Sequence, residues 1–175
     1  YYDDSYIIGK SSIEKDNFDV LIFARRDIEN VIIPSFIKQI NSDAFYYCSK
    51  IQKIEFAPNS ELIMIGNYAF AYSSVKNIVI PSSVFQICAS SFIFCESLEK
   101  VECLNDSNLI SIGNNAFSYS SIKSISFPSS IKEIDEYCFI ENKELIDINI
   151  IQRNEQNFVL YDDSMLIVSP NLKKA

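Results

Sequence analysis

The chain has 175 residues, with 15 basic and 23 acidic side chains and a formal net charge of -8. This length suits a single domain or a single array of repeats with a sizeable buried core. The sequence contains no histidine, which removes Ser-His and Cys-His nucleophile pairs and imidazole metal ligands. The acidic balance argues against a surface that binds nucleic acid.

Residues 1–27 carry a degenerate form of the pattern that fills the rest of the chain, and we predict an N-terminal hairpin-like or degenerate repeat segment there. No basic stretch followed by an apolar run precedes Tyr1, so no signal peptide is visible, and we expect a processed or trimmed piece. No segment approaches the ~20 apolar residues needed to cross a bilayer. We therefore expect no membrane insertion within this segment.

From residue 28 onward the sequence repeats itself. Phenylalanines recur with gaps of 25, 22, 25 and 22 residues, and three prolines are spaced 47 residues apart. When residues 34–80 are aligned with residues 81–127, 21 of the 47 positions are identical. A period of this kind indicates a solenoid. The recurring residues are Phe45, Phe70, Phe92, Phe117 and Phe139, and Pro34, Pro81 and Pro128.

Each short repeat holds two apolar stretches. The first alternates apolar and polar positions and is rich in β-branched residues, which is typical of a half-buried strand. The second, such as Ile37 to Phe45, predicts a short strand or a tight turn, because a coil of 22–25 residues is too short for a strand plus a long helix. The six copies of the first stretch are residues 28–33, 51–56, 75–80, 98–103, 122–127 and 145–150.

We therefore predict a right-handed solenoid, α/β or mainly β, over residues 28–150. Stacked coils place equivalent residues about 4.8 Å apart, which is the spacing of paired strands. The six strand copies are expected to form one parallel sheet roughly 24 Å deep, with the phenylalanines as an internal spine. No single coil can bury its own apolar face, so stability must come from neighbouring coils.

Several segments carry a resemblance to a known family. Residues 78–84 (IVIPSSV), 92–98 (FIFCESL) and 112–117 (IGNNAF) resemble the BspA-like class of leucine-rich repeats, and the resemblance extends over about residues 18–150. Members of that family are surface antigens of protozoan parasites and oral bacteria. The resemblance implies a leucine-rich repeat superhelix in a cell-surface or secreted protein that adheres to host components or other cells. Ser73, Ser120 and Asn142 stand where other copies have the family cysteine.

The two ends of the chain resemble each other. Residues 2–8 (YDDSYII) parallel residues 161–167 (YDDSMLI), and the apolar residues around the second copy predict a hairpin with an acidic turn. We predict that residues 151–175 form a hairpin-like C-terminal cap or the start of a further unit. A longer repeating unit is slightly favoured, because a cap need not resemble its opposite end.

The cysteines raise the question of bridges or metal sites. Their number is odd and none are spaced as C-x-x-C, so we predict that they are free structural thiols. The sequence leaves open whether Asn105, in an N-x-S triplet, is glycosylated. The five cysteines are Cys48, Cys88, Cys95, Cys103 and Cys138.

The other residues that suggest chemistry have simpler interpretations. The acidic pairs at residues 3–4 and 162–163 match no calcium-binding loop, and turn residues are the expected role. Gly66 and Gly113 occupy the same repeat position and are interpreted as a tight bend of the coil. We predict no catalytic residue, no metal site and no cofactor.

The outward side of the predicted sheet is the candidate partner-binding face, because solenoids usually bind through such a surface. Its alternate positions could instead be solubilising side chains with cross-strand charge pairing. A second ladder, Tyr47, Tyr72, Phe94 and Tyr119, could form an aromatic ridge for a partner, although packing over the coil edge is commoner. The candidate face comprises Lys53, Glu55, Asn77, Val79, Lys100, Glu102, Ser124 and Ser126.

Three hypotheses about function follow. The first is a non-enzymatic surface or secreted module that binds a host matrix or cell-surface protein, with an oligomeric state that the sequence leaves open. The second is an intracellular leucine-rich repeat scaffold, which free thiols would suit equally well. The third is a carboxylate-based hydrolase, since residue type alone does not exclude paired acidic groups.

Overall fold

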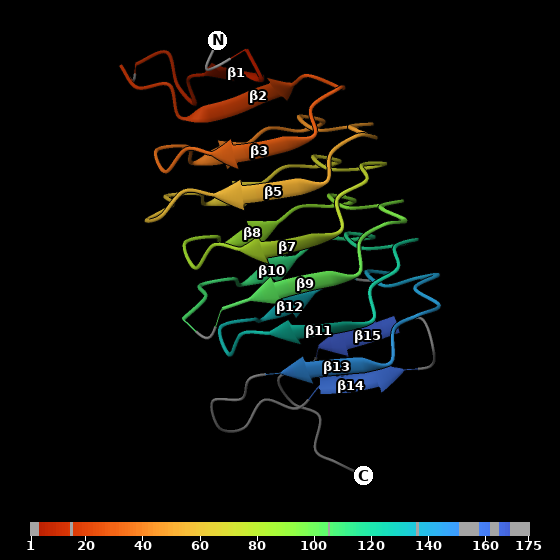
Figure 1. Cartoon of the computed structure of the whole chain (residues 1–175). Coiled ribbons are helices and arrows are strands. Elements are labelled where there is room, and N and C mark those ends of the chain that lie inside the picture. Colours follow the sequence, from red (N-terminus) through yellow and green to blue (C-terminus); the bar gives the residue numbers. More distant parts are fainter. Residues whose placement is uncertain are drawn as a thin grey trace.

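The computed structural model describes residues 4–14, 16–104, 106–135 and 137–150, and the strands at 158–161 and 165–168. These residues form strands and turns without any helix, so the mainly β alternative of the predicted solenoid is correct. The chain winds through about five turns, here called coils, that stack from the N-terminus to the C-terminus (Figure 1). In the part that the structure describes, no helix has the length and apolar character of a membrane span.

The six predicted strand copies are all strands, and they run parallel along one side of the stack. The first five of them have the predicted alternation, so that Val31 and Ile33 are buried while Asn30 and Ile32 point outward. Equivalent residues pair from coil to coil, for example Ile78 with Val101. The strands are β3 (Asn30–Ile33), β5 (Lys53–Phe56), β7 (Asn77–Ile80), β9 (Lys100–Cys103), β11 (Ser124–Phe127) and β13 (Asp147–Ile150).

The prediction of one continuous six-stranded sheet is wrong. β3 pairs with β5, and β7, β9, β11 and β13 form a separate four-stranded sheet, while no ladder joins the fully described strands β5 and β7. β5 ends on Phe56, which is half-buried, where the equivalent position of β9 is the smaller, buried Cys103. The bulk of the ring does not by itself explain the break, because Phe56 pairs with Ile33 and Phe127 ends β11 at the same position within a continuous sheet.

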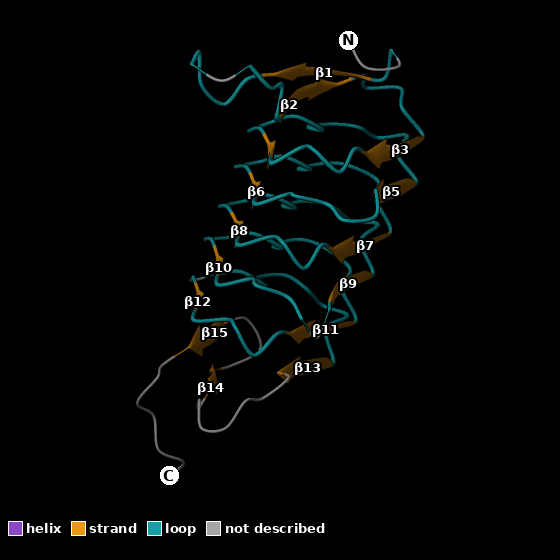
Figure 2. Ribbon diagram, turned by 90° about the vertical axis from the view of Figure 1, so that its left-hand side faces the viewer, coloured by secondary structure: helices purple, strands orange, loops and turns teal. Residues whose placement is uncertain are grey.

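A second sheet runs along the other side of the coils, as Figure 2 shows. Its seven strands are continuous, with an antiparallel pair at the N-terminal end followed by parallel two-residue strands. This confirms the prediction of a short strand on the second side. The strands are β1 (Tyr6–Gly9), β2 (Val20–Ala24), β4 (Gln39–Ile40), β6 (Met64–Ile65), β8 (Gln86–Ile87), β10 (Ser111–Ile112) and β12 (Glu133–Ile134).

The phenylalanine spine fills the space between the two sheets. Its five rings, Phe45, Phe70, Phe92, Phe117 and Phe139, are stacked with centroids 4.8, 5.0, 5.3 and 5.7 Å apart. All five side chains are buried. Near-parallel rings at the spacing of the coils bury a large apolar area that no single coil could cover by itself.

The turns that carry the spine are linked by backbone hydrogen bonds from one coil to the next. The Phe45 N–H donates to the Ala69 carbonyl at 2.7 Å, and the Phe92 N–H donates to the Ala116 carbonyl at 2.8 Å. The residue two positions after each spine ring has a left-handed backbone, as in Tyr47 with a φ of 56°. This conformation turns the chain sharply enough for these N–H groups to reach the next coil.

Small polar residues lie beneath these turns, at the position of the family cysteine. The Cys95 thiol donates to the Phe70 carbonyl at 3.0 Å, and the Ser120 hydroxyl donates to the Phe117 carbonyl at 2.7 Å. A thiol, a hydroxyl and an amide can therefore replace one another here, because each satisfies a buried carbonyl. The residues are Cys48, Ser73, Cys95, Ser120 and Asn142, all buried.

Gly66 and Gly113 are required for a different reason from the predicted bend. Neither has a positive φ. A Cβ at Gly66 would lie 2.7 Å from the Ser42 nitrogen, and one at Gly113 would lie 2.6 Å from the Ala89 nitrogen. The preceding coil passes too close for any side chain, so the requirement is for space between coils.

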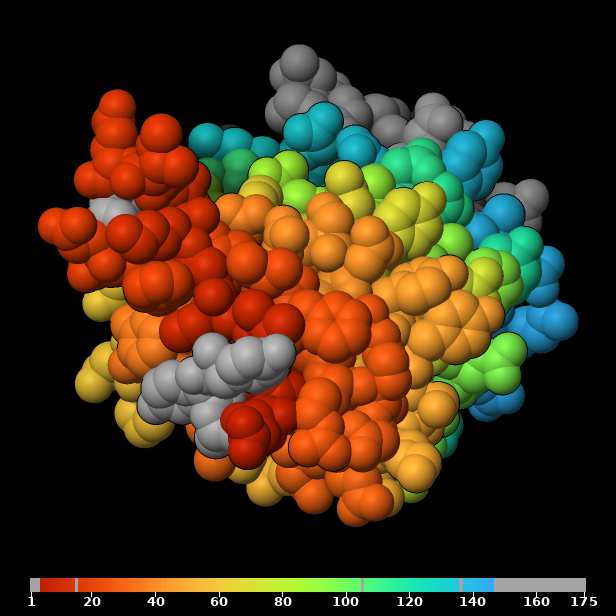
Figure 3. Space-filling view, turned by 90° about the horizontal axis from the view of Figure 1, so that it is seen from above, coloured from red at the N-terminus to blue at the C-terminus, as the bar shows by residue number. Residues whose placement is uncertain are grey.

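The N-terminal residues cover the first coil. Seen along the stack, the N-terminal residues, coloured red, lie across its end (Figure 3). Arg26 adds donors to carbonyls at this end of the stack. Its guanidinium donates to the Ala44 carbonyl at 3.0 Å, which also accepts from the Ala24 N–H, and to the Ala24 carbonyl at 3.3 Å. It lies 4.2 Å from the centre of the Phe23 ring.

At the other end, β14 (Phe158–Tyr161) and β15 (Met165–Val168) pair antiparallel, with Tyr161 opposite Met165. The predicted C-terminal hairpin is therefore present.

Some predicted features cannot be placed. The acidic residues 162–163, like Asp3 and Asn105, lie outside the described residues. The division into three segments at residues 27 and 150 stays a prediction.

Candidate functional site

The candidate partner-binding face, hereafter the sheet face, lies on β5, β7, β9 and β11. Its residues form two outward rows that follow the pairing register, with Asn77 opposite Lys100 and Val79 opposite Glu102. Glu102 and Ser126 are half-buried, and the other six side chains are exposed. The first row is Lys53, Asn77, Lys100 and Ser124, and the second is Glu55, Val79, Glu102 and Ser126.

The charges on the sheet face are paired within strands, which corrects the expected cross-strand pairing. The Lys53 ammonium lies 2.8 Å from the Glu55 carboxylate. The Lys100 ammonium lies 2.7 Å from the Glu102 carboxylate. The next strand in each case carries neutral residues, so each lysine finds its counter-charge two residues along its own strand. The described part of the face is therefore electrically neutral, although the whole chain has a net charge of -8.

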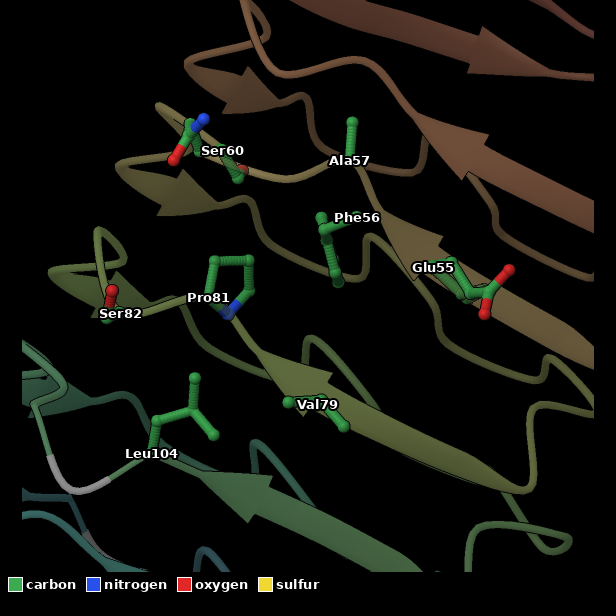
Figure 4. A pocket seen from close by; sticks show the side chains of 10 residues that line it. Glu55, Phe56, Ala57, Ser60, Val79, Pro81, Ser82 and Leu104 are labelled. Atoms are coloured by element: carbon green, nitrogen blue, oxygen red, sulfur yellow. The ribbon is translucent and has the colours of Figure 1, made fainter.

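A pocket of about 440 Å³ opens at the edge of the sheet face, where β5 and β7 are not paired. Phe56, Val79, Pro81 and Leu104 supply apolar walls. Figure 4 shows Phe56 at the end of β5, Val79 and Pro81 on and after β7, and Leu104 after β9. The extra loop after β5 contributes a further wall. Among the described lining residues only Glu55 is ionisable, which leaves no pair of carboxylates here for hydrolysis.

The pocket was not among the predicted features of the chain. The sequence nevertheless distinguishes this place. Phe56 and Cys103 occupy the same position of two similar 47-residue repeats but differ in size, and an extra loop follows each of them. Two neighbouring coils must be placed before this difference becomes a cavity. Val79 and Glu55 are the two predicted face residues that also line the pocket.

The aromatic ladder lies along another edge of the coils, away from the sheet strands. Tyr47, Tyr72, Phe94 and Tyr119 stack with centroids 4.7, 4.8 and 4.5 Å apart. Tyr47 is 53% exposed and Tyr119 40% exposed. The rings thus pack over the coil edge while remaining open to solvent, and their faces are occupied by one another.

The cysteines are all free thiols, as predicted, and four of the five are buried. Burial raises the pKa of Cys95, Cys103 and Cys138 to about 12. Burial also raises the pKa of Cys48, against an opposing hydrogen bond from Arg26. Because the thiolate is the reactive form, these residues are structural rather than nucleophilic at neutral pH.

Other exposed charged groups form separate pairs, and some of these pairs join neighbouring coils. Lys123 lies 2.9 Å from Glu99 of the preceding coil, which raises the pKa of the lysine and lowers that of the carboxylate. Within the described ranges, no group of three or more cysteine, aspartate or glutamate side chains is arranged to hold a metal ion.

The fold and the repeat geometry correspond to one class of protein, the leucine-rich repeat solenoids. The chain belongs to the family with a BspA-type leucine-rich repeat region, which matches in six copies over residues 16–146. No curated protein matches the sequence.

Solved structures share this fold. The chain is 28% identical to the pneumococcal vaccine antigen PcpA, with a TM-score of 0.71 over 78% of this chain. It is 24% identical to TpLRR, a leucine-rich repeat protein of T. pallidum, with a TM-score of 0.71 over 82% of this chain. A leucine-rich repeat protein from Bacteroides ovatus is 22% identical, with a TM-score of 0.55 over 85% of this chain.

The compared proteins are longer than this chain. The matched region spans 34% of the pneumococcal antigen, 67% of TpLRR and 52% of the Bacteroides protein. The likenesses to TpLRR and to the Bacteroides protein concern the fold alone.

Proposed function

We propose that the chain is a non-enzymatic interaction module on a cell surface or in the secreted medium, which binds host components or other cells through the sheet face. The observation that carries this proposal is the regular, exposed and polar outer side of β5 to β11, which no other described segment covers. A rigid array of alternate side chains is suited to a protein partner. The family membership and the vaccine-antigen description of PcpA support the surface location.

The binding test uses Lys53→Glu/Lys100→Glu. Each reversal replaces an ion pair with two adjacent carboxylates on the exposed face, so a partner that contacts this face should bind with a changed association rate and a changed salt dependence. Binding is measured on intact host cells and on a panel of matrix proteins. Circular dichroism and the urea midpoint verify the fold.

The matched control is Lys38→Glu/Lys132→Glu. These lysines precede β4 and β12, at one repeat position on the opposite sheet, so the variant has the same change in net charge. We expect its binding to match the wild type. Unchanged binding by the face variant, or an equal loss in both variants, would remove the binding site from the sheet face.

The second candidate function is an intracellular scaffold, which the five free thiols favour because a reducing compartment keeps cysteines unpaired. Antibody staining of intact and permeabilised source cells separates the two. Staining that appears only after permeabilisation would reject the surface location.

A further inference from the structure

One row of equivalent side chains beside the seven-stranded sheet changes from charged at its ends to apolar at its centre. Each member directly precedes a two-residue strand, from β4 to β12, on the side of the coils where Figure 2 labels β6, β8, β10 and β12. The N–H of each member after the first donates to the carbonyl of the member before it, at 2.8 or 2.9 Å. The members, hereafter the Phe85 row, are Lys38, Ile63, Phe85, Ile110 and Lys132.

The centre of the row is apolar although the fold does not require it to be. Phe85 is 48% exposed and Ile63 is 49% exposed. The positions 47 residues before and after Phe85, in otherwise similar repeats, are Lys38 and Lys132. A solvated lysine therefore fits this position, and core packing does not explain the phenylalanine. Neighbouring exposed apolar side chains with a charged border indicate an interaction surface.

The order of residues along the row identifies the partner as a second copy of the chain. The row reads lysine, isoleucine, phenylalanine, isoleucine, lysine from either end. A two-fold axis at Phe85 would place Ile63 against Ile110 of the second copy and Phe85 against its own equivalent. A two-fold interface needs one patch that is complementary to itself in this way, whereas an unrelated partner requires no such symmetry.

The charges at the two ends of the row permit the same arrangement. The Lys38 ammonium lies 3.5 Å from the Glu61 carboxylate, and Lys132 is followed by the exposed Glu133. Each end thus carries one basic and one acidic group, although the chain has a net charge of -8. The two-fold axis brings the Lys38 end of one copy to the Lys132 end of the other, so that each lysine can face a carboxylate. A polar rim around an apolar centre is the usual anatomy of an interface.

We propose that the protein forms a two-fold symmetric dimer through the Phe85 row, with Phe85, Ile63 and Ile110 as its apolar centre. The inference goes beyond the proposed function and does not depend on it. The strands of the sheet face lie on the other side of the coils, so a dimer presents two free sheet faces (Figure 2). The apolar centre spans three coils, or about 10 Å, which makes the dimer weak and reversible.

The first test measures the dimer by sedimentation equilibrium, from micromolar to millimolar protein. Phe85→Lys introduces the residue that stands at this position in the two similar repeats, so the variant should fold as the wild type does. We expect it to weaken dimerisation about tenfold or more. Ile32→Lys is the matched control, because it replaces another exposed apolar side chain on the opposite side of the coils. A wild type that stays monomeric, or equal weakening in both variants, would overturn the dimer.

An exchange of charges tests the two-fold axis. Ile63→Lys and Ile110→Glu should each weaken dimerisation, because each places a charge against an isoleucine of the second copy. In the double variant every new lysine faces a new glutamate of the other copy, while Phe85 separates the two within one chain, so dimerisation should return. Circular dichroism and the urea midpoint verify each fold. Weakening that persists in a folded double variant would reject the two-fold arrangement.

The dimer and the binding of host components fail independently. Lys53→Glu/Lys100→Glu should keep the dimer, and Phe85→Lys should keep host binding by the monomer. The host-binding comparison is made below the concentration at which the protein dimerises, because Lys38 and Lys132 of its control variant belong to the Phe85 row. A wild type that binds host cells through the sheet face but stays monomeric at millimolar concentration would refute the dimer and keep the proposed function.

Discussion

Phe92 lies in the middle of the spine, stacked between Phe70 and Phe117 and fully buried. Two residues further on, Phe94 is only half-buried, between Tyr72 and Tyr119 on the coil edge. Two positions in the sequence therefore separate a ring in the core from a ring at the surface. The left-handed turn at Phe94, with a φ of 56°, directs the two rings to different places.

We predict that Phe92→Ala lowers the free energy of unfolding by ~3–5 kcal/mol, through lost apolar transfer and the remaining cavity. Phe94→Ala should cost only about 1 kcal/mol, the contribution of surface ring stacking. Urea denaturation of the two variants measures the difference. Equal midpoints would contradict the placement of the spine.

The buried thiols predict how stability depends on alkaline pH. In the folded protein the pKa of Cys95 is about 12, whereas its ordinary value is 9.0. Between pH 9 and pH 12 the thiol is deprotonated in the unfolded state but still protonated in the folded state. The free energy of unfolding is therefore unaffected by this group below about pH 9, and above it falls by about 1.4 kcal/mol per pH unit for each such thiol.

Cys95→Ala should therefore show a shallower loss of stability above pH 9 than the wild type, even if it is less stable at pH 7. The measurement is the urea midpoint as a function of pH. Cys88→Ala is the control, because Cys88 is only half-buried and lies outside the row beneath the turns. Identical slopes in the wild type and Cys95→Ala would mean that the thiol is not desolvated.

At the scale of the element, β5 and β7 differ from the other strands of the sheet face. β9 pairs with strands on both sides, while β7 pairs only with β9. Backbone amides without a ladder partner exchange with solvent more readily. The gap between β5 and β7 is thus a local weakness in an otherwise regular array.

We expect hydrogen exchange to be faster in residues 77–80 than in residues 100–103. Mass spectrometry of proteolytic fragments follows both segments. Equal protection of β7 and β9 in the wild type would show that the two sheets are joined in solution.

At the scale of the whole molecule, stability depends on contacts between neighbouring coils, and the ends need caps. Arg26 lies at the N-terminal end and donates to the Ala44 and Asp43 carbonyls, which also accept backbone N–H groups. Its neighbour Arg25 instead pairs with Asp27 in solvent, at 2.7 Å.

Arg26→Ala should lower the free energy of unfolding by about 1–3 kcal/mol, because it removes charge-assisted hydrogen bonds to the Ala24, Asp43 and Ala44 carbonyls. Exchange should quicken in the first coil, around Ala44, before it changes elsewhere. Arg25→Ala should have little effect, since an exposed pair contributes little. An equal response of the two variants would reject the cap.

The sequence alone predicted the coils, the six strands and their register, the buried spine, the free thiols and the family. These features follow from a period of two within each strand and a period of 47 residues along the chain, both of which are local and repeated several times. The alternation places Val79 outward and Ile78 inward whatever the neighbouring coils do. The residues of the sheet face therefore follow from the strand pattern alone.

Only the tertiary structure revealed the break in the sheet, the pocket, the pairing of charges within strands and the reason for the glycines. Each depends on the distance between two coils, which is decided by packing. No ladder joins β5 to β7, and the lysines of the sheet face lie next to neutral strands. At Gly113 the backbone of the previous coil leaves no room for a Cβ. A sequence pattern states which side chains face each other, but close packing decides how near they come.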